Sequence, residues 1–176
     1  SKNVSAYVVD ADTGLALVEH KSNAAMTPAS TIKLVTAAAA LERLGGASRF
    51  STRVTQAGNI ITVVGGGDPT LTSRTANKWR GKPAGVERPP SLDELAAATA
   101  QALGTTATAY VVNVDTSFFQ GRSAVQSWPR TYVASGYVAP VTGLTVDFGV
   151  TKNDQPLGDP ATFAGKYFAS ALRKHG

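Results

Sequence analysis

Two side chains that could act as a nucleophile and a base, Ser30 and Lys33, stand three residues apart. They open a stretch from Pro28 to Leu41 in which nearly every residue after Lys33 is apolar or small. Residues three apart lie on one face of a helix, with Cβ atoms about 5–6 Å apart. The pattern therefore predicts a hydroxyl and an amine side by side at the start of a helix, as in a serine activated by a lysine.

The spacing alone is weak support, because a chain of this length contains Ser-x-x-Lys about 0.7 times by chance. In the structural alternative, Ser30 caps the helix and Lys33 is a solvated residue of its first turn. The rest of the helix favours the chemical interpretation. A helix that is apolar all round is expected to be buried, and a buried lysine needs a partner or a function.

Composition narrows the class of protein. The 176 residues are 43% hydrophobic and 16% charged, which is typical of a folded chain. There is no cysteine, and neither His20 nor His175 has the spacing of a metal ligand, so we expect no metal and no cofactor. No apolar run reaches the roughly 18 residues of a membrane span. Ser1 is neither an initiator methionine nor part of a signal peptide, so we expect a processed or cut chain.

The charge of the chain also limits its partners. Its 17 basic residues give a net charge of +5. They are scattered and are not interleaved with aromatic residues, so no nucleic-acid partner is expected. A basic protein suits an anionic cell wall.

Hairpins are predicted on both sides of the helix. Residues 4–10 and 15–20 read as strands around a turn, and residues 50–55 and 60–64 form a second pair around Gly58-Asn59. The Gly-Gly-Gly-Asp-Pro-Thr-Leu segment that follows lacks the Gly-Lys-Ser/Thr of a phosphate-binding loop. It predicts a tight turn in which Asp68 bonds backbone amides.

The second half of the chain predicts two more helices. The polar residues 73–90 predict a mobile loop, and Ser91 and Glu94 form the capping box of a helix that ends before Gly104. Strands are expected over 107–114 and 144–148. The aromatic residues of the irregular segment between them are expected to pack, and these are Phe118, Phe119 and Trp128. Asp159-Pro160 opens a last helix, whose apolar side carries Phe163, Tyr167, Phe168 and Leu172.

Four of these stretches, in this order and across nearly the whole chain, resemble the class C low-molecular-weight penicillin-binding proteins. They are residues 8–14, 27–41, 66–71 and 137–141, of which the third reads Gly-Gly-Asp-Pro-Thr-Leu and the fourth Tyr-Val-Ala-Pro-Val. That family contains the D-alanyl-D-alanine carboxypeptidase/endopeptidases of bacterial cell-wall maturation. The alanine-rich composition of the chain is similar to that of actinobacterial members.

The family carries three motifs, Ser-x-x-Lys, Ser-x-Asn and Lys-Thr-Gly, and only Ser30 to Lys33 stands in its proper place. Ser1-Lys2-Asn3 fits the second in letters but precedes the nucleophile. Lys174-His175-Gly176 departs from the third and ends a helix where the family has a strand. We therefore expect the chain to be the first portion of a longer enzyme.

The resemblance implies an α/β fold, the N-terminal part of a penicillin-binding-protein/β-lactamase-like serine transpeptidase fold. Residues 1–47 would carry the hairpin and the nucleophile helix of the catalytic domain. Residues 48–150 would form an inserted mixed α/β domain, and residues 151–176 would return to the catalytic domain.

The resemblance also implies an extracytoplasmic hydrolase of the periplasm or cell wall. Ser30 would form an acyl-enzyme with peptidoglycan stem peptides, Lys33 would take its proton, and β-lactams would acylate the same serine. The chain on its own is expected to be inactive, because the other two motifs are absent from their places.

Three other functions fit parts of the sequence. A β-lactamase shares Ser-x-x-Lys but lacks the long insert. A non-catalytic cell-wall-binding or scaffolding module would fit a chain that holds half of the catalytic apparatus. Asp12-Thr13-Gly14 matches the triplet of aspartic proteases, although a turn with glycine at positive φ explains it better.

Overall fold

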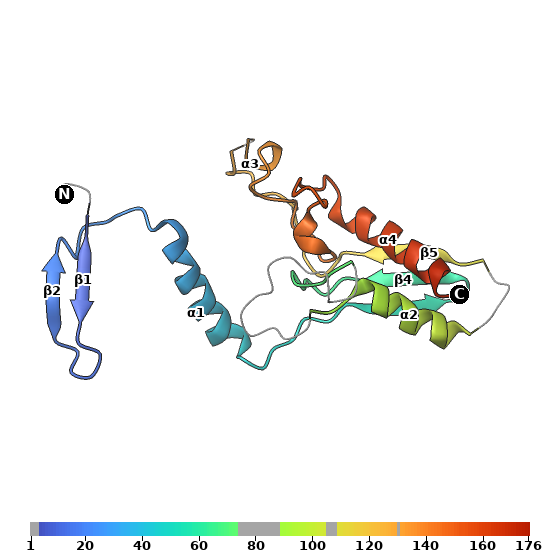
Figure 1. Ribbon diagram of the computed structural model, residues 1–176, viewed down its shortest axis with the longest axis horizontal. Coiled ribbons are helices and arrows are strands. Elements are labelled where there is room, and N and C mark those ends of the chain that lie inside the picture. The colour runs from blue at the N-terminus through green and yellow to red at the C-terminus, as the bar shows by residue number, and fades with distance from the viewer. Residues whose placement is uncertain (1–3, 74–88, 105–108, 130) are drawn as a thin grey trace. The chain divides into compact units, whose positions relative to one another are not determined.

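The chain forms two compact units, Ser1–Ser48 and Arg49–Gly176. A computed structural model describes residues 4–73, 89–104, 109–129 and 131–176 (Figure 1). Most of the loop predicted to be mobile, residues 74–88, lies outside the described residues.

The first unit begins with the predicted hairpin. Strand β1 (Ala6–Val9) pairs antiparallel with β2 (Ala16–His20). In the turn between them, Asp10 Oδ1 accepts hydrogen bonds from the N–H of Thr13 at 2.8 Å and from its hydroxyl at 2.7 Å. These bonds, the side-chain bond first, hold the pKa of Asp10 below its ordinary value. Gly14 adopts φ 72°, so the Asp-Thr-Gly triplet is part of a turn, as expected.

The helix that begins at Ser30 and Lys33 follows. A 3₁₀ turn, η1 (Ala29–Thr31), leads into α1 (Ile32–Leu44), which ends where Gly45 N–H donates to Leu41 O at 2.9 Å. The helix predicted over 28–41 is confirmed, and it ends three residues later, at Leu44.

The prediction that this helix is buried is wrong for the described chain. No residue of α1 is buried, and Leu34 exposes 74% of its surface. The other regular structure of this unit is the hairpin β1–β2, whose own large apolar side chains are also exposed. Such a small hairpin offers too little surface to cover an apolar helix on all sides.

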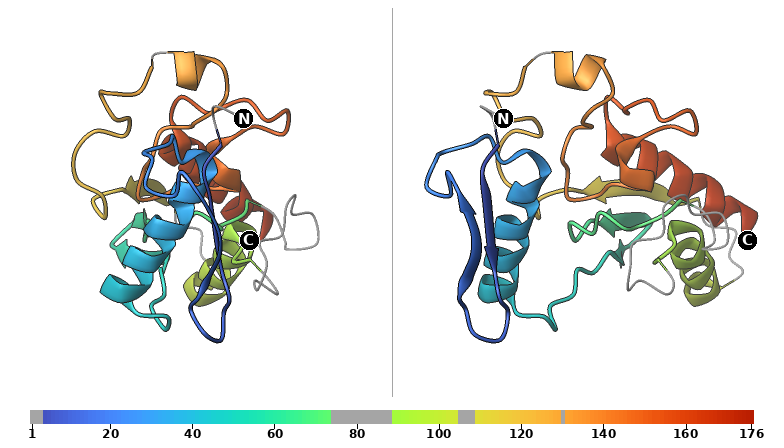
Figure 2. Two further views of the ribbon diagram at one scale, coloured as in Figure 1. Left: turned by 90° about the vertical axis from the view of Figure 1, so that its left-hand side faces the viewer. Right: turned by 60° about the vertical axis from the view of Figure 1, so that its left-hand side comes forward.

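The second unit is built on a three-stranded sheet in the order β3-β4-β5. Strand β3 (Arg53–Ala57) pairs antiparallel with β4 (Ile60–Val64) across the predicted Gly58-Asn59 turn. Strand β5 (Val111–Asp115) pairs parallel with β4, in register from Ile60 opposite Val111 to Val64 opposite Asp115 (Figure 2). A parallel pair needs a long crossover, which the chain between β4 and β5 provides.

Two capped helices complete this unit. Helix α2 (Leu92–Leu103) starts at Ser91, whose Oγ accepts from Glu94 N–H at 3.4 Å. Helix α4 (Pro160–Lys174) starts at Asp159, whose Oδ1 accepts from Thr162 N–H at 2.9 Å. Both predicted starts are confirmed. A short helix, α3 (Thr131–Ala134), lies between them in sequence.

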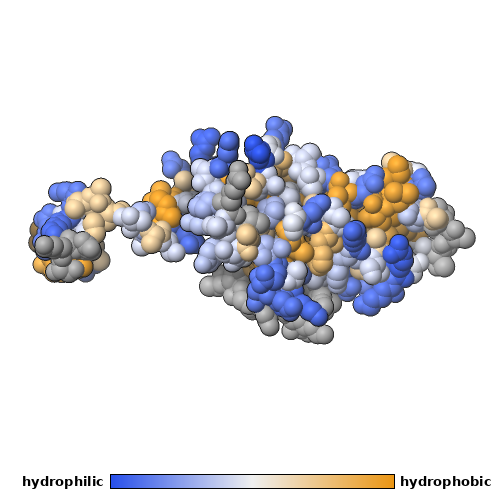
Figure 3. Space-filling model, turned by 90° about the horizontal axis from the view of Figure 1, so that it is seen from above, coloured by the Kyte–Doolittle hydropathy of each residue, from blue (hydrophilic) through white to orange (hydrophobic). Residues whose placement is uncertain are grey.

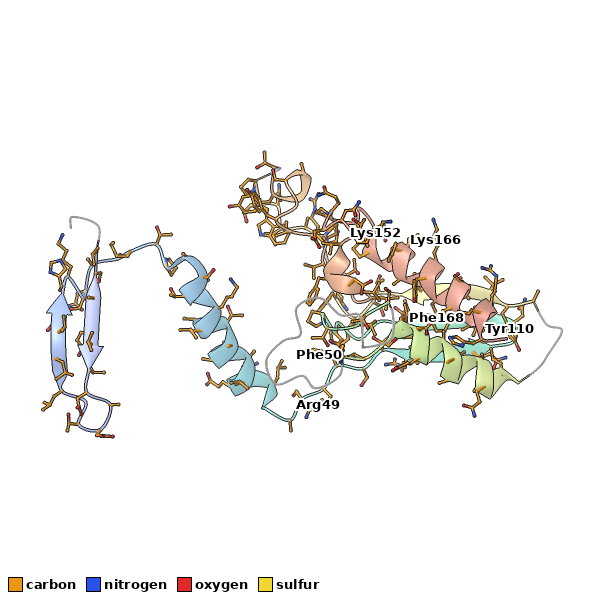
Figure 4. All side chains as sticks on the ribbon, in the orientation of Figure 1. Arg49, Phe50, Tyr110, Lys152, Lys166 and Phe168 are labelled. Atoms are coloured by element: carbon orange, nitrogen blue, oxygen red, sulfur yellow. The ribbon has the colours of Figure 1, made fainter. Side chains whose placement is uncertain are left out.

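The core lies between these helices and one face of the sheet. On β4, Ile61 and Val63 are fully buried while Thr62 and Val64 are only half-buried, so alternate residues face the helices. Phe168 points from α4 into this core and is 0% exposed (Figure 4). The other buried apolar residues are Leu71, Leu92, Ala96, Leu144, Val146, Ala161, Ala164 and Ala171.

Helix α4 packs against α2 and β5, within the unit Arg49–Gly176 (Figure 1). A Cβ on Gly165 would lie 2.6 Å from Val114 Cγ1, so the helix runs close to the strand. From sequence, residues 151–176 are expected to return to the domain of residues 1–47. Helix α4 supplies part of the core of the second unit, and the three-part domain division stays a prediction.

The strand predicted over 144–148 is wrong. Leu144 and Val146 are buried as alternation requires, but the chain then turns through η3 (Asp147–Gly149). Asp147 and Phe148 adopt φ 51° and 58°, which is left-handed and cannot continue a strand. Asp147 N–H donates to Leu71 O at 3.0 Å, and its Oδ1 accepts from Ser73 N–H at 3.1 Å. These bonds fix a turn where the alternating pattern indicated a strand.

Apolar side chains are also found on the surface of the second unit, between charged residues (Figure 3). Phe50, Phe118 and Phe119 expose 45–51% of their surface. In the part of the chain that the structure describes, no helix is both long and apolar enough to cross a membrane.

Candidate active site

The structure brings the two predicted catalytic side chains together. Ser30 lies in the 3₁₀ turn η1, and Lys33 lies in the first turn of α1. Lys33 Nζ donates a hydrogen bond to Ser30 Oγ over 3.1 Å. Both side chains are exposed, so this pair is accessible to solvent in the described chain.

The backbone before Ser30 holds the serine at the head of the helix. Thr31 N–H donates to Pro28 O at 3.1 Å, and the Thr31 hydroxyl bonds the same oxygen. Ala29 has φ 45°, a left-handed conformation that is unusual for a residue with a Cβ. Strained backbone of this kind is frequent at functional sites, and here it falls on the residue directly before the serine. The sequence carries no signal for it, because Ala29 is neither glycine nor asparagine.

This geometry suits acyl transfer. A serine hydroxyl is a weak nucleophile until a neighbouring base takes its proton, and an amine at hydrogen-bond distance can do so in its neutral form. The N–H groups at the start of a helix point away from it, toward the position of a substrate oxyanion. The described geometry therefore places a hydroxyl and an amine within hydrogen-bond distance at the start of a helix.

The letters that match the other two family motifs lie at the two ends of the chain. Residues 1–3 lie outside the described residues. Lys174 and His175 lie at the end of α4, where Lys174 Nζ is 3.7 Å and His175 Nε2 3.4 Å from Asp93 Oδ1. Lys174 forms an ion pair with Asp93 at the start of α2, His175 lies within hydrogen-bond distance of the same carboxylate, and both residues stand at the end of a helix, not in a strand. Among the described residues, no three His, Asp or Glu side chains gather as a metal site.

The glycine-rich segment forms a turn whose backbone packs closely against neighbouring loops. Asp68 Oδ1 accepts from Thr70 N–H at 2.8 Å and from its hydroxyl at 2.7 Å, which confirms the predicted turn. A Cβ on Gly66 would lie 2.1 Å from Ser51 O, so only glycine allows this backbone approach. A Cβ on Gly67 would lie 2.7 Å from the Phe118 ring. Phe118 therefore packs, as predicted, and the surface that it contacts is the backbone of Gly67.

Comparison with known proteins identifies the class of peptidase to which the chain belongs. The whole chain, residues 1–176, matches the model of the D-Ala-D-Ala carboxypeptidase 3 (S13) family. The chain belongs to this peptidase family.

The similar curated proteins are actinobacterial. The chain is 34% identical over 175 residues to a carboxypeptidase of Mycobacterium tuberculosis and 32% identical over 179 residues to carboxypeptidase DacB of Mycolicibacterium smegmatis. These matches cover 94% and 96% of this chain, but 36% and 37% of the relatives. A D-alanyl-D-alanine carboxypeptidase of Actinomadura is 32% identical over 81% of this chain and 25% of its own length. The chain thus spans about a third of the length of the two mycobacterial relatives.

Proposed function

We propose that this chain provides the nucleophile of an extracytoplasmic serine D-Ala-D-Ala carboxypeptidase/endopeptidase that acts on peptidoglycan stem peptides. The observation that carries the proposal is the 3.1 Å hydrogen bond from Lys33 Nζ to Ser30 Oγ at the start of α1. The names of the family and of the Actinomadura relative support the substrate class.

In this mechanism Ser30 Oγ attacks the carbonyl carbon of the penultimate D-alanine, and Lys33 takes the hydroxyl proton. The Ser30 N–H donates to the developing oxyanion. The bond to the terminal D-alanine then breaks, and its amine leaves with a proton. Water attacks the Ser30 ester, releases the shortened peptide and restores the serine hydroxyl. A β-lactam acylates the same oxygen, because its ring amide takes the place of the scissile peptide bond.

Lys33 must be neutral to accept a proton. Burial disfavours a charged amine, so covering α1 with further protein would favour the reactive form. The exposed apolar residues of α1 are suited to such covering, with Leu34 at 74% and Val35 at 63% exposure.

Release of D-alanine from a D-Ala-D-Ala peptide by the full-length protein tests the proposal. The wild type should release D-alanine and should be inhibited by penicillin, while Ser30→Ala should do neither. Ser22→Ala, a change of a half-buried serine in the same unit whose hydroxyl bonds Glu19, is the control and should keep full activity. Equal release by Ser30→Ala and wild type would refute the proposal.

A further inference from the structure

The hydroxyl of Thr31 bonds a carbonyl oxygen that the backbone of the same residue also bonds. Thr31 N–H donates to Pro28 O at 3.1 Å, and the Thr31 hydroxyl donates to the same oxygen. Ala29 and Ser30 are the two residues between these partners. The bonds therefore close a short loop around the serine, directly before α1.

This short loop contains a strained residue. Ala29 has φ 45°, while Pro28 and Thr31, the two ends of the loop, have φ −73° and −65°. A left-handed residue with a Cβ carries a conformational cost and persists only where neighbouring contacts hold it. Because Ala29 directly precedes Ser30, its backbone angles set where the Ser30 N–H and Oγ lie. A return of Ala29 to a right-handed conformation would move Ser30 relative to Lys33.

A threonine hydroxyl in a helix often bonds a carbonyl three or four residues earlier without any further role. Thr36 makes such a bond in the same helix, from its Oγ1 to Ile32 O at 3.3 Å. Thr36 closes a turn of regular α-helix, which the backbone hydrogen bonds of α1 already hold. Thr31 instead closes the 3₁₀ turn that contains the left-handed Ala29. Removing the same kind of bond at these two positions therefore separates positioning of the serine from stability of the helix.

We infer that Thr31 is a positioning residue, whose hydroxyl holds Pro28 O, keeps Ala29 left-handed and so fixes Ser30 against Lys33. The inference rests on the proposed function, because the role that it assigns is in the reaction of Ser30. In that mechanism Thr31 neither takes a proton nor donates to the oxyanion, and it acts through the geometry of the serine. Loss of its hydroxyl should therefore slow acylation and leave the first, non-covalent binding of a β-lactam unchanged.

Rapid-mixing kinetics of the full-length protein with a fluorescent penicillin, over a range of concentrations, separate the acylation rate constant from the dissociation constant of the first complex. Thr31→Val replaces the hydroxyl by a methyl group at an exposed position. The acylation rate constant should fall about tenfold, the upper range for one net hydrogen bond, with the dissociation constant unchanged. Thr31→Ser keeps the hydroxyl and should restore the rate. Thr36→Val is the matched control and should react like wild type.

A second substitution tests whether the hydroxyl acts through Ala29. Glycine adopts positive φ about as readily as negative φ, so Ala29→Gly removes the conformational cost that the Thr31 hydroxyl offsets. The double variant Ala29→Gly and Thr31→Val should therefore be acylated faster than Thr31→Val alone. If the hydroxyl only stabilised the helix, the added glycine would bring no recovery, because glycine is less favourable than alanine in regular structure.

Crystal structures of the full-length wild type and Thr31→Val give a readout that does not depend on activity. In Thr31→Val we expect Ala29 to leave the left-handed region and the distance from Ser30 Oγ to Lys33 Nζ to exceed that of a hydrogen bond. If the wild type does not react with penicillin, the proposed function fails, while these structures still test the positioning role. The inference is overturned if Thr31→Val is acylated as fast as Thr36→Val, if the double variant recovers no rate, or if Ala29 and the serine–lysine distance stay unchanged in Thr31→Val.

Discussion

Lys33 is the side chain that distinguishes chemistry from packing at the head of α1. Its amine bonds Ser30 Oγ at 3.1 Å, whereas the alternative from sequence was a solvated lysine without a role. Lys33→Met keeps the length and the apolar stem of the side chain but removes the proton acceptor. We expect the full-length variant to fold and to be acylated by penicillin about 10²–10⁴-fold more slowly, the usual contribution of a general base.

Stopped-flow acylation with a fluorescent penicillin measures this effect. Arg43→Met, at the other end of the same helix, is the control and should be acylated at nearly the wild-type rate. A loss below tenfold for Lys33→Met would mean that the lysine only positions the serine.

Asp159 is a residue whose charge should give the second unit a pH dependence. Hydrogen bonds from the Thr162 hydroxyl and then from the Thr162 N–H hold the pKa of Asp159 below its ordinary value of 3.8. Because the folded-state pKa is lowered, this stabilisation is present above the ordinary value and is lost as pH falls through the lowered one. Asp159→Ala should reduce the free energy of unfolding by about 1 kcal/mol at pH 7, as loss of an N-cap does.

Urea unfolding at neutral and acidic pH measures both the loss of stability in Asp159→Ala and the pH dependence due to this carboxylate. Asp159→Asn keeps a capping oxygen, so it should stay close to wild type at pH 7 and should lose less stability on acidification. The same loss on acidification in Asp159→Asn and wild type would show that this carboxylate does not contribute to the pH dependence.

At the scale of elements, the glycine segment after β4 sets how closely the loops of the second unit approach. Gly66→Ala would place a Cβ 2.1 Å from the backbone oxygen of Ser51, which cannot move as a side chain can. We expect a loss of about 1–3 kcal/mol, the usual cost of overpacking. Gly158→Ala is the matched control, because nothing lies within 4 Å of its added Cβ. Thermal unfolding of the two variants compares them, and equal stability would contradict the tight approach seen here.

Local signals predicted most elements, and long-range contacts explain the misses. The Ser91 cap, the Asp159-Pro160 start and the Gly58-Asn59 turn each depend on a few neighbouring residues, and all three are confirmed. The turn at Asp147 depends on hydrogen bonds to Leu71 and Ser73, which are far away in sequence. The alternating pattern over 144–148 contains no sign of these bonds, so it wrongly predicted a strand. The parallel pairing of β4 with β5 and the packing of α4 on β5 are likewise contacts that no local pattern encodes.

The contact between the Ser30 and Lys33 side chains was predictable from sequence, but the backbone conformation and the burial around them were not. The three-residue spacing of Ser30 and Lys33 on a helix was enough to bring their side chains together. The left-handed Ala29 had no signal in the sequence. The burial expected for α1 depends on what packs around it, and in the described chain its apolar residues are exposed.

At the scale of the whole molecule, the 176-residue chain alone should be catalytically inert. It lacks Ser-x-Asn and Lys-Thr-Gly in their family places, and α1, which carries Lys33, has no buried residue. Without these groups neither the second oxyanion donor nor a dry environment for Lys33 is available. Assays of the isolated chain on a D-Ala-D-Ala peptide and on nitrocefin should show no turnover above that of its Ser30→Ala variant. Serine-dependent turnover would mean that this chain is sufficient for catalysis.

The most direct test of the catalytic assignment is the location of the covalent adduct. The full-length protein is treated with penicillin, its intact mass is measured, and the modified peptide is sequenced by tandem mass spectrometry. One penicilloyl group on Ser30 is the predicted result, with no adduct on Ser30→Ala. An adduct on another residue, or undiminished labelling of Ser30→Ala, would contradict the assignment of Ser30 as the nucleophile.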